Sequence, residues 1–491
     1  MSTYLAFDLG ASSGRAILGT LEGGRLRAEE LHRFPNEMVD LNGRLCWNVV
    51  SLFEEVKAGL RASARAGHRP ASMGIATWGV DFGLLDRSGE LAGLPVAYRD
   101  ARTAGAMEAV WQLVPRARIY ELTGCQFLSL NTLYQLYSLV RDNAPVLAIA
   151  ADLLFMPDLL GYFLTGRKYT EYTIASTSQM LNARTRAWEP ELFAPLRVPQ
   201  EIMQAPVAPG TRIGPLRETV AQEVEGHLEL IATASHDTAA AVAAVPASGN
   251  DWAYISSGTW SLMGVESEQP VLTPQALELN ITNEGGVSGF RVLKNIAGMW
   301  LLEQCRRGWG AGHEYADLLA AAADAPAFRS FVYPDAPVFN TPPDMSQAIA
   351  GFCRGTAQPA PGTPPQFVRA ILESLALRYR MVLEELRLIC PHPINRLHII
   401  GGGARNRLLC QFAADATGLP VIAGPAEATA VGNLLVQAMA SGELASAAAM
   451  RAVVADSFTL EHYEPRTTVD WDRAYDRFRE VTSRAGVGGS T

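Results

Sequence analysis

Two segments of this 491-residue chain, far apart in the sequence, follow the same plan of two apolar runs around a turn of small and polar residues. The first covers residues 4–19, and the second covers residues 252–266. Such a plan is typical of a β-hairpin. Each turn offers backbone N–H groups and short hydroxyls, which can hold an anion such as a phosphate. One such turn alone is most often a plain hairpin, but two of them, each opening one half of the chain, are a far rarer combination.

Two further features accompany the hairpins. Asp8 stands two residues before the glycine of the first turn, and the apolar run 396–400 is followed by the glycines 401–403. Together with the two hairpins, they indicate an ATPase fold that holds a nucleotide between two lobes. A P-loop enzyme is excluded because no G-x-x-x-x-G-K-[ST] occurs, and the glycines 401–403 lack the spacing of a dinucleotide-binding fingerprint.

Strands alternate with helices in the rest of the sequence. We expect strands around a turn in residues 73–86 and a strand in 396–400, and we expect helices in 54–65, 132–140 and 366–388. Interleaved strands and helices predict the α/β class. The length exceeds what one hydrophobic core usually serves, so we expect two domains, 1–245 and 246–491, joined by the small-residue stretch 245–250.

Composition narrows the possible partners. The net charge is −9, and the Arg residues are scattered, which argues against binding to nucleic acid. No apolar run approaches the ~18 residues that a membrane span needs, and none opens the chain as a signal peptide would. The six cysteines form no CxxC pair, which favours reduced core thiols over a zinc or disulfide site. We therefore expect a cytoplasmic protein without a membrane or nucleic-acid partner.

A candidate for proton transfer lies in residues 231–245, where an apolar strand leads into an alanine-rich helix. Asp237 stands at the junction, where helix N–H groups favour an ionised carboxylate that can accept a proton. One alternative is that Asp237 only caps the helix. Another is that His236 and Asp237 bind a metal, as in a phosphohydrolase, but the eight His residues show no local grouping that would complete such a site.

Seven segments carry a more specific signal. They are 7–15 (FDLGASSGR), 77–82 (TWGVDF), 95–100 (PVAYRD), 235–238 (SHDT), 256–264 (SSGTWSLMG), 280–286 (NITNEGG) and 293–295 (LKN). Together they resemble the FGGY carbohydrate kinases, from Tyr4 to about Thr459. SHDT and NITNEGG resemble, in particular, the members of that family that phosphorylate L-rhamnulose.

The resemblance implies a fold and a function. The fold would be two ribonuclease-H-like domains of the actin/hexokinase type, with the active site in the cleft between them. The activity would be ATP-dependent phosphorylation of L-rhamnulose at O1, giving L-rhamnulose 1-phosphate in L-rhamnose catabolism. Two alternatives stay open: a kinase for another ketose such as L-fuculose, and a sugar-binding relative without catalysis.

The resemblance also implies roles for individual residues. Asp237 would be the catalytic base, and Asp8 would hold Mg2+ through water. The substrate-binding residues would be Gly79, His236, Asp237, Thr238 and Asn295. The ATP-binding residues would be Ala11, Ser12, Ser13, Gly14, Arg15, Thr259, Glu303 and Gly402. Glu303 stands where the family pattern predicts Gln, so its side chain can accept hydrogen bonds from the ribose but cannot donate them.

Overall fold

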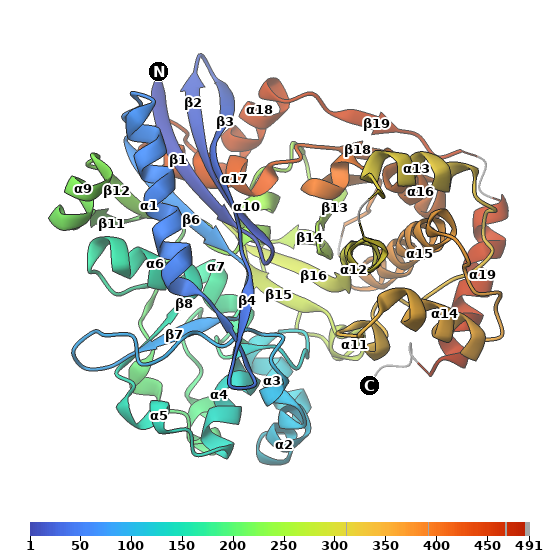
Figure 1. The fold of residues 1–491 in the computed structure, drawn as a ribbon, viewed down its shortest axis with the longest axis horizontal. Helices are drawn as coiled ribbons and strands as arrows, with labels where there is room; N and C mark the ends of the chain where they lie inside the picture. The colour runs from blue at the N-terminus through green and yellow to red at the C-terminus, as the bar shows by residue number, and fades with distance from the viewer. Residues whose placement is uncertain (311, 391, 467–468, 487–491) are drawn as a thin grey trace. The chain divides into compact units, whose positions relative to one another are not determined.

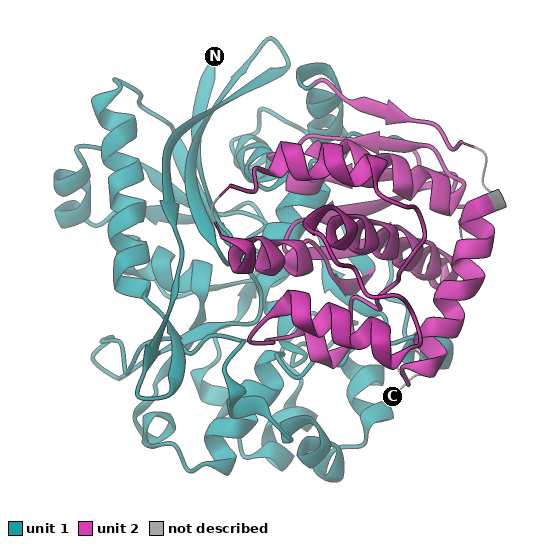
Figure 2. Ribbon diagram, turned by 45° about the vertical axis from the view of Figure 1, so that its right-hand side comes forward, with its two compact units in different colours: residues 1–248, 266–292, 428–458 teal, residues 249–265, 293–427, 459–491 magenta. Residues whose placement is uncertain are grey.

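The computed structural model describes residues 1–310, 312–390, 392–466 and 469–486, and these residues form two compact units (Figures 1 and 2). Unit 1 contains residues 1–248, 266–292 and 428–458, and unit 2 contains 249–265, 293–427 and 459–491. Each unit is therefore assembled from three pieces of the chain. The division into two consecutive domains, 1–245 and 246–491, stays a prediction. In the structure, the later segments 266–292 and 428–458 pack within unit 1.

Unit 1 is built on a six-stranded sheet with the order β11-β12-β6-β1-β2-β3. The strands β1 (Ser2–Leu9), β2 (Ser13–Glu22) and β3 (Arg25–Pro35) are antiparallel neighbours, so the first expected hairpin is confirmed. Next to β1, β6 (Ser72–Thr77) and β12 (Glu229–Ala232) run parallel to it, and β11 (Thr211–Pro215) closes the edge. The hairpin turn between β1 and β2 thus lies at the end of a central strand.

Helices from distant parts of the sequence cover this sheet. The helix α1 (Val49–Arg65) packs against β2 and β3, and its amino terminus is capped by the Asn48 side chain, which accepts from the Ser51 N–H. The helix α17 (Ala428–Ala440) packs against β1 and β6. Because the buried Gln437 of α17 donates from Nε2 to the Leu5 carbonyl at 3.0 Å, this late segment is tied directly to the first strand.

The second expected strand pair in unit 1 is arranged differently from a simple hairpin. Residues 73–86 do form two strands, β6 and β7 (Phe82–Leu85). However, β7 pairs with β8 (Asp152–Phe155), while β6 pairs with β1 and β12. The segment between β6 and β7 is therefore free to form a tight loop rather than a hairpin turn.

A second large sheet, most of whose strands belong to unit 2, repeats this arrangement of strands; its β15 (Thr282–Gly285) belongs to unit 1, and its β16 covers Phe290–Ala297. The order of the second large sheet is β15-β16-β14-β13-β17-β18-β19, in which β13 (Trp252–Ser257) and β14 (Trp260–Ser267) form the second expected hairpin. The strands β17 (Arg396–Ile400) and β18 (Val421–Ala423) run parallel to β13, and β19 (Glu461–Tyr463) is antiparallel to β18. A hairpin followed by parallel strands is common to both sheets, so the predicted α/β fold with two ribonuclease-H-like sheets is confirmed.

The strand and helix predictions for unit 2 are also confirmed. The helix α15 (Pro364–Ile389) covers the expected 366–388, and β17 matches 396–400. The helix α16 (Arg407–Thr417) packs beside α15. His398 is buried on β17 beside the Trp252 ring.

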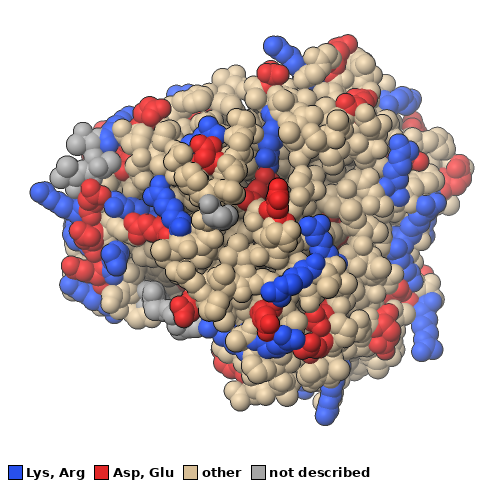
Figure 3. Space-filling model, turned by 180° about the vertical axis from the view of Figure 1, so that it is seen from behind, with Lys and Arg blue, Asp and Glu red and all other residues tan. Residues whose placement is uncertain are grey.

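The cysteines, the length of the apolar helices and the surface charges complete the description. All six cysteines are free; five are buried, and Cys390 is half-buried. Among the described residues, no helix is both long enough and apolar enough to cross a membrane. On the face drawn in Figure 3, Lys and Arg side chains are interspersed with Asp and Glu side chains rather than gathered in one area.

Candidate active site

Asp237 is the first residue of α10 (Asp237–Ala243), directly after the strand β12 and a short extended segment. Its Oδ1 accepts from the Thr238 N–H at 2.6 Å and from the Thr238 hydroxyl at 3.2 Å. The helix N-cap position is taken by His236, not by Asp237. Asp237 is therefore not the N-cap residue of α10. Its carboxylate lies in the first turn of the helix and accepts hydrogen bonds from the adjacent Thr238.

The environment of Asp237 raises the pKa of its carboxyl group above the ordinary value. Burial is the largest cause, and the lowering effects of His236 and of the Thr238 hydrogen bonds do not cancel it. From the sequence we expected the helix amino terminus to favour the ionised carboxylate. In the structure, desolvation raises the pKa of this group by more than the nearby donors lower it. A raised pKa moves the group toward the range in which a general base works best.

His236 and Thr238 flank Asp237, so three of the expected sugar-binding residues are brought together by their order in the chain. The His236 Nε2 atom lies 3.4 Å from Asp237 Oδ1. On its other side, His236 Nδ1 faces Arg291 Nη2 at 3.0 Å, and Arg291 Nη2 lies 2.9 Å from Glu284 Oε2. From the sequence we gave no role to either residue: Glu284 lies within the NITNEGG segment, to which no chemical role was assigned, and Arg291 lies outside the seven quoted segments.

Gly79 lies in the tight loop between β6 and β7. An added Cβ at Gly79 would lie 3.2 Å from Thr177 Cγ2, so the loop packs closely on that side chain. The next residue, Val80, has a φ of +66°, which is strained for a β-branched side chain. Its backbone is held on both sides: the Val80 N–H donates to Thr177 Oγ1 at 3.0 Å, and Thr132 Oγ1 donates to the Val80 carbonyl at 2.7 Å.

A single short segment supports both the Gly79 loop and the start of α10. It comprises Glu171, the helix α7 (Tyr172–Ala175) and the turn η2 (Ser176–Ser178). The His236 N–H donates to Thr173 Oγ1 at 3.2 Å, and the Ser235 N–H donates to Glu171 Oε2 at 3.1 Å. Because Thr177 holds Val80 and Thr173 holds His236, the loop and the carboxylate are fixed to one another through this segment.

A buried carboxylate lies beneath the Gly79 loop. Asp81 has no exposed surface and accepts hydrogen bonds from Trp47 Nε1 at 2.6 Å, Trp78 Nε1 at 3.0 Å and the Tyr98 N–H at 3.1 Å. Burial raises the pKa of Asp81 to about 6. Trp78 is buried against the Trp47 ring, so its indole packs in the core and also donates to Asp81.

The first phosphate turn is closed by its own backbone and by a distant asparagine. The Gly10 N–H donates to the Ser13 carbonyl at 2.9 Å. The buried Asn36 donates from Nδ2 to the Gly10 carbonyl at 2.8 Å, and its own N–H donates to the Ser12 carbonyl at 3.1 Å. Asn36 therefore fixes the turn 10–14, which is built from small residues. The sequence around Asn36 did not indicate this role.

Asp8 and Arg15 face each other across the base of that turn. Arg15 Nη2 donates to Asp8 Oδ2 at 2.6 Å, and the two residues are directly opposed in the β1–β2 register. The sequence analysis assigned one to a metal ion and the other to a phosphate. In the structure they form an ion pair, so both stand at the same end of the hairpin.

In unit 2, the three expected nucleotide residues Thr259, Glu303 and Gly402 come from three separate elements. Thr259 lies in the turn between β13 and β14, and its hydroxyl is 3.5 Å from Glu303 Oε2 on α12 (Trp300–Trp309). Gly401 and Gly403 pack against Ser257 at the base of the same turn. Gly402 between them is exposed, and an added Cβ would meet no atom within 4 Å.

Asn295 lies on β16 (Phe290–Ala297) and belongs to unit 2, whereas Gly79, His236, Asp237 and Thr238 belong to unit 1. Its strand is anchored within unit 2: the Ala297 N–H donates to Asp335 Oδ1 at 2.7 Å, and Lys294 donates to Glu385 at 2.7 Å. The predicted contact of Asn295 with a sugar stays a prediction.

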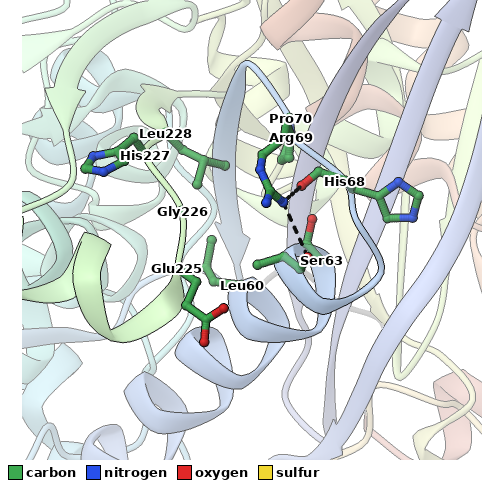
Figure 4. A pocket seen from close by; sticks show the side chains of 10 residues that line it. Leu60, Ser63, His68, Arg69, Pro70, Glu225, Gly226, His227 and Leu228 are labelled. Atoms are coloured by element: carbon green, nitrogen blue, oxygen red, sulfur yellow. Dashed lines mark hydrogen bonds between the residues drawn. The ribbon is translucent and has the colours of Figure 1, made fainter.

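A small hollow in unit 1 lies apart from these residues (Figure 4). It has a volume of about 40 Å³, which suits water but not a sugar or a nucleotide. In Figure 4 the rings of His68 and His227 lie on opposite sides of it, and Arg69 is bonded to the backbone carbonyls of Ala64 and His68. Among the described residues, no three His, Cys, Asp or Glu side chains form a group that could hold a metal ion by themselves.

Comparisons with known proteins agree over the whole length of the chain. The family model described as the FGGY family of carbohydrate kinases, N-terminal domain, matches residues 3–244, and the model of the C-terminal domain matches 253–441. A protein of Bacteroides thetaiotaomicron named rhamnulokinase is 50% identical over 97% of this chain and 98% of its own. A protein of the same name from Pectobacterium carotovorum subsp. carotovorum is 43% identical over 98% of this chain and 97% of its own.

Solved structures show the same fold at low sequence identity. Gluconate kinase from Lactobacillus acidophilus superposes with a TM-score of 0.81 at 15% identity and covers 99% of both chains. Glycerol kinase from Plasmodium falciparum, solved with ADP, superposes with a TM-score of 0.77 at 13% identity and covers 99% of this chain and 98% of its own. These likenesses concern the fold alone.

Proposed function

Because this chain belongs to the FGGY family of carbohydrate kinases, we propose that it transfers the γ-phosphoryl group of ATP to the O1 hydroxyl of L-rhamnulose. The products are L-rhamnulose 1-phosphate and ADP. The relatives named rhamnulokinase, at 50% and 43% identity over nearly the full length, support this substrate over L-fuculose. The observation that carries the proposal is the placement of Asp237 between His236 and Thr238 at the start of α10.

Asp237 is the proton acceptor in this proposal. Phosphoryl transfer requires the protein chiefly to align the reactants and to neutralise charge. As O1 attacks the γ-phosphorus in line, its proton passes to the Asp237 carboxylate. The two hydrogen bonds from Thr238 fix the carboxylate, and burial raises its pKa above the ordinary value, which makes it a stronger base than an exposed carboxylate.

The sugar is held by the residues around Asp237. Gly79 offers a surface without a side chain, and the Thr177 support keeps that loop in place before substrate arrives. His236 and Thr238 supply polar atoms beside the carboxylate, and Asn295 supplies an amide from unit 2. Preorganisation of this kind lowers the entropy that must be lost on the way to the transition state.

The nucleotide is held by residues of both units in this proposal. Backbone N–H groups of residues 11–15 and the Thr259 hydroxyl contact the phosphates, and Gly402 lies against the adenosine. Glu303 stands beside Thr259 and accepts a hydrogen bond from the ribose. The glycine turn 401–403 suits close approach because its middle residue is exposed and unobstructed.

Asp8 is the proposed partner of Mg2+. A single carboxylate fits an ion that keeps most of its water and is carried by the phosphates, rather than one held in a protein cage. This agrees with the lack of a larger acidic group among the described residues. When bound, Mg2+ neutralises charge on the phosphate oxygens, while Arg15, which pairs with Asp8, supplies a second positive charge at the same turn.

An assay of ADP release with a panel of ketoses tests the proposal. We expect the highest kcat/KM for L-rhamnulose, with L-fuculose, D-xylulose and glycerol well below it. A pocket distinguishes sugars that differ by one methyl group by only ~1 to 3 kcal/mol, so side activity on related ketoses is expected. A clear preference for one of the other sugars would contradict the substrate assignment, and no turnover of any of them would contradict the kinase function.

A further inference from the structure

Behind His236 lies a buried set of charged side chains that the proposed reaction does not use. Arg291 on β16 has no exposed surface, and Glu284 on β15 (Thr282–Gly285) is also buried. Both belong to unit 1, as do His236 and Asp237. Buried charges are costly unless they are paired, so this arrangement calls for an explanation beyond packing.

Arg291 directs its donors at three acceptors. Its Nη2 lies 3.0 Å from His236 Nδ1 and 2.9 Å from Glu284 Oε2, and its Nε donates to the Gly285 carbonyl at 2.9 Å. The arginine guanidinium stays protonated in proteins and has no acceptor atom. His236 Nδ1 also lies 3.3 Å from Glu284 Oε2, but its shorter contact, at 3.0 Å, is with this guanidinium, and in that contact Nδ1 can only be the acceptor.

This contact determines which nitrogen of His236 carries the proton. A neutral imidazole has one N–H, and it must then be at Nε2. Nε2 is the nitrogen that faces Asp237 Oδ1 at 3.4 Å. His236 thus presents a hydrogen-bond donor to the carboxylate and to the proposed sugar position, and it has no lone pair there with which to accept a proton.

We infer that Arg291, held by Glu284, is a positioning residue that fixes His236 in the Nε2–H tautomer. The inference rests on the proposed function and deepens it. With His236 restricted to donating, Asp237 is left as the proton acceptor of the adjacent pair, and His236 holds a sugar oxygen or the Asp237 carboxylate through its N–H.

A purely stabilising ion pair does not explain the arrangement as well. Arg291 Nη1 is buried and has no hydrogen-bond partner among the described residues, and an unsatisfied buried donor lowers stability. Burial raises the pKa of the Glu284 carboxyl, but nearby groups, of which the Arg291 charge is the largest, lower it by more, so the carboxylate stays charged and fixes the guanidinium. Glu284 and Gly285 orient the guanidinium toward the imidazole. In this orientation Arg291 Nη1 makes no hydrogen bond within the described part of the chain.

Nitrogen NMR of the wild-type protein labelled with ¹⁵N-histidine tests the tautomer directly. The His236 signals are assigned by their loss in His236→Gln, and long-range proton–nitrogen correlations identify the protonated nitrogen. We expect a protonated Nε2 and an unprotonated Nδ1. A protonated Nδ1, alone or together with Nε2, would overturn the inference. This measurement needs no turnover, so it stands apart from failure of the proposed kinase activity.

Kinetics of two variant pairs test the consequence. His236→Gln can place an amide donor near the Nε2 position, whereas His236→Asn reaches only the Nδ1 position, so we expect Gln to keep the higher kcat. Arg291→Met should lower kcat about 10- to 100-fold, the usual cost of losing a supporting partner, and Arg291→Lys should recover part of it. Arg212→Lys, an exposed position of the same unit, is the matched control and should leave kcat unchanged.

Equal activity of His236→Gln and His236→Asn would contradict the donor role of Nε2. Equal activity of Arg291→Met and the wild type would contradict the role of Arg291. Should Arg291→Met fail to fold, Arg291→Lys and the wild-type NMR spectrum still decide the question.

Discussion

Gly432 of α17 lies directly against the carbonyl oxygen of Ala240 in α10, so closely that an added Cβ would stand 1.8 Å from that oxygen. Both residues belong to unit 1. The absent side chain of Gly432 is what lets α17 press on the helix that begins with Asp237.

Gly432→Ala should therefore destabilise the protein, because neither backbone can yield without moving its helix. Overpacking of this kind typically costs ~1 to 3 kcal/mol. The measurement is thermal unfolding, with Gly351→Ala in α14 (Met345–Gly355) as the control. An added Cβ at Gly351 meets no atom within 4 Å, so helix propensity should there make Ala neutral or stabilising by up to ~1 kcal/mol. Equal melting temperatures of the two variants would refute the steric account.

Asp237→Asn should abolish most sugar phosphorylation and preserve the fold. Asn keeps the size of the side chain and can still accept from Thr238, but it cannot take a proton. A loss in kcat of ~100- to 10,000-fold is expected from general-base assistance, with a smaller change in KM for ATP. Steady-state kinetics and thermal unfolding of the same preparation provide the test; near-native turnover in a normally melting protein would mean that another group accepts the proton.

Thr177→Val should loosen the Gly79 loop. The Val80 N–H would lose its acceptor in a buried place, which costs ~1 to 3 kcal/mol of stability, and we expect KM for the ketose to rise several-fold. Thr177→Ser keeps the hydroxyl and is the matched control. The prediction is contradicted when both variants show the same ketose KM.

The free energy of unfolding should depend on pH through two buried carboxyl groups of unit 1. Burial raises the pKa of Asp81 to about 6 and of Glu171 to about 7, from ordinary values of 3.8 and 4.5. Between the unfolded and folded pKa values the folded state binds more protons, so stability falls as the pH rises from about 4 to about 7. The slope is at most ~1.4 kcal/mol per pH unit for each group.

Chemical denaturation across that pH range measures the effect. Asp81→Asn and Glu171→Gln remove one titrating group each, and each should flatten the curve over its own part of the range. A stability that rises between about pH 4 and 7 in the wild type would show that other groups dominate.

Glu303→Gln should lower KM for ATP. Glu303 Oε2 lies 3.5 Å from the Thr259 hydroxyl, which we place at the phosphates, and a carboxylate there repels them. We expect a several-fold decrease in KM that becomes smaller at high salt, because screening weakens the repulsion. The exposed Glu278 offers a control: Glu278→Gln removes the same charge and should leave KM unchanged. Gln keeps an oxygen that can accept from the ribose, so an increase in KM for Glu303→Gln would show that the negative charge itself favours ATP binding.

Local patterns predicted most of the elements that build the two sheets. The hairpins 4–19 and 252–266 and the helix 366–388 were readable because their apolar spacing is set by neighbours in the sequence. The pairing of β7 with β8 was not readable, since β8 lies about seventy residues later and its four residues carry no distinctive pattern. The same limit applies to α17, whose contact with β1 joins the two ends of the chain.

The candidate site divides in the same way. Asp237, His236 and Thr238 are consecutive, so one motif identified all three, whereas their supports Glu171, Thr173 and Arg291 are ordinary residues at distant positions. The raised pKa of Asp237 could not be predicted from the sequence. A helix amino terminus is visible in the sequence, but the desolvation that outweighs it depends on what packs around the side chain.

The three-piece construction of unit 1 has a consequence for how the protein is made. A ribosome that has translated residues 1–248 has produced all six strands of the main sheet of unit 1 and the helix that carries Asp237, but not α17, which packs against β1 and β6 and supplies Gln437 to the Leu5 carbonyl. The apolar surface of β1 and β6 that α17 covers stays exposed until residues 428–440 leave the ribosome. We therefore expect a polypeptide that ends before residue 428 to lack this cover and to be prone to aggregation through the exposed apolar surface of β1 and β6.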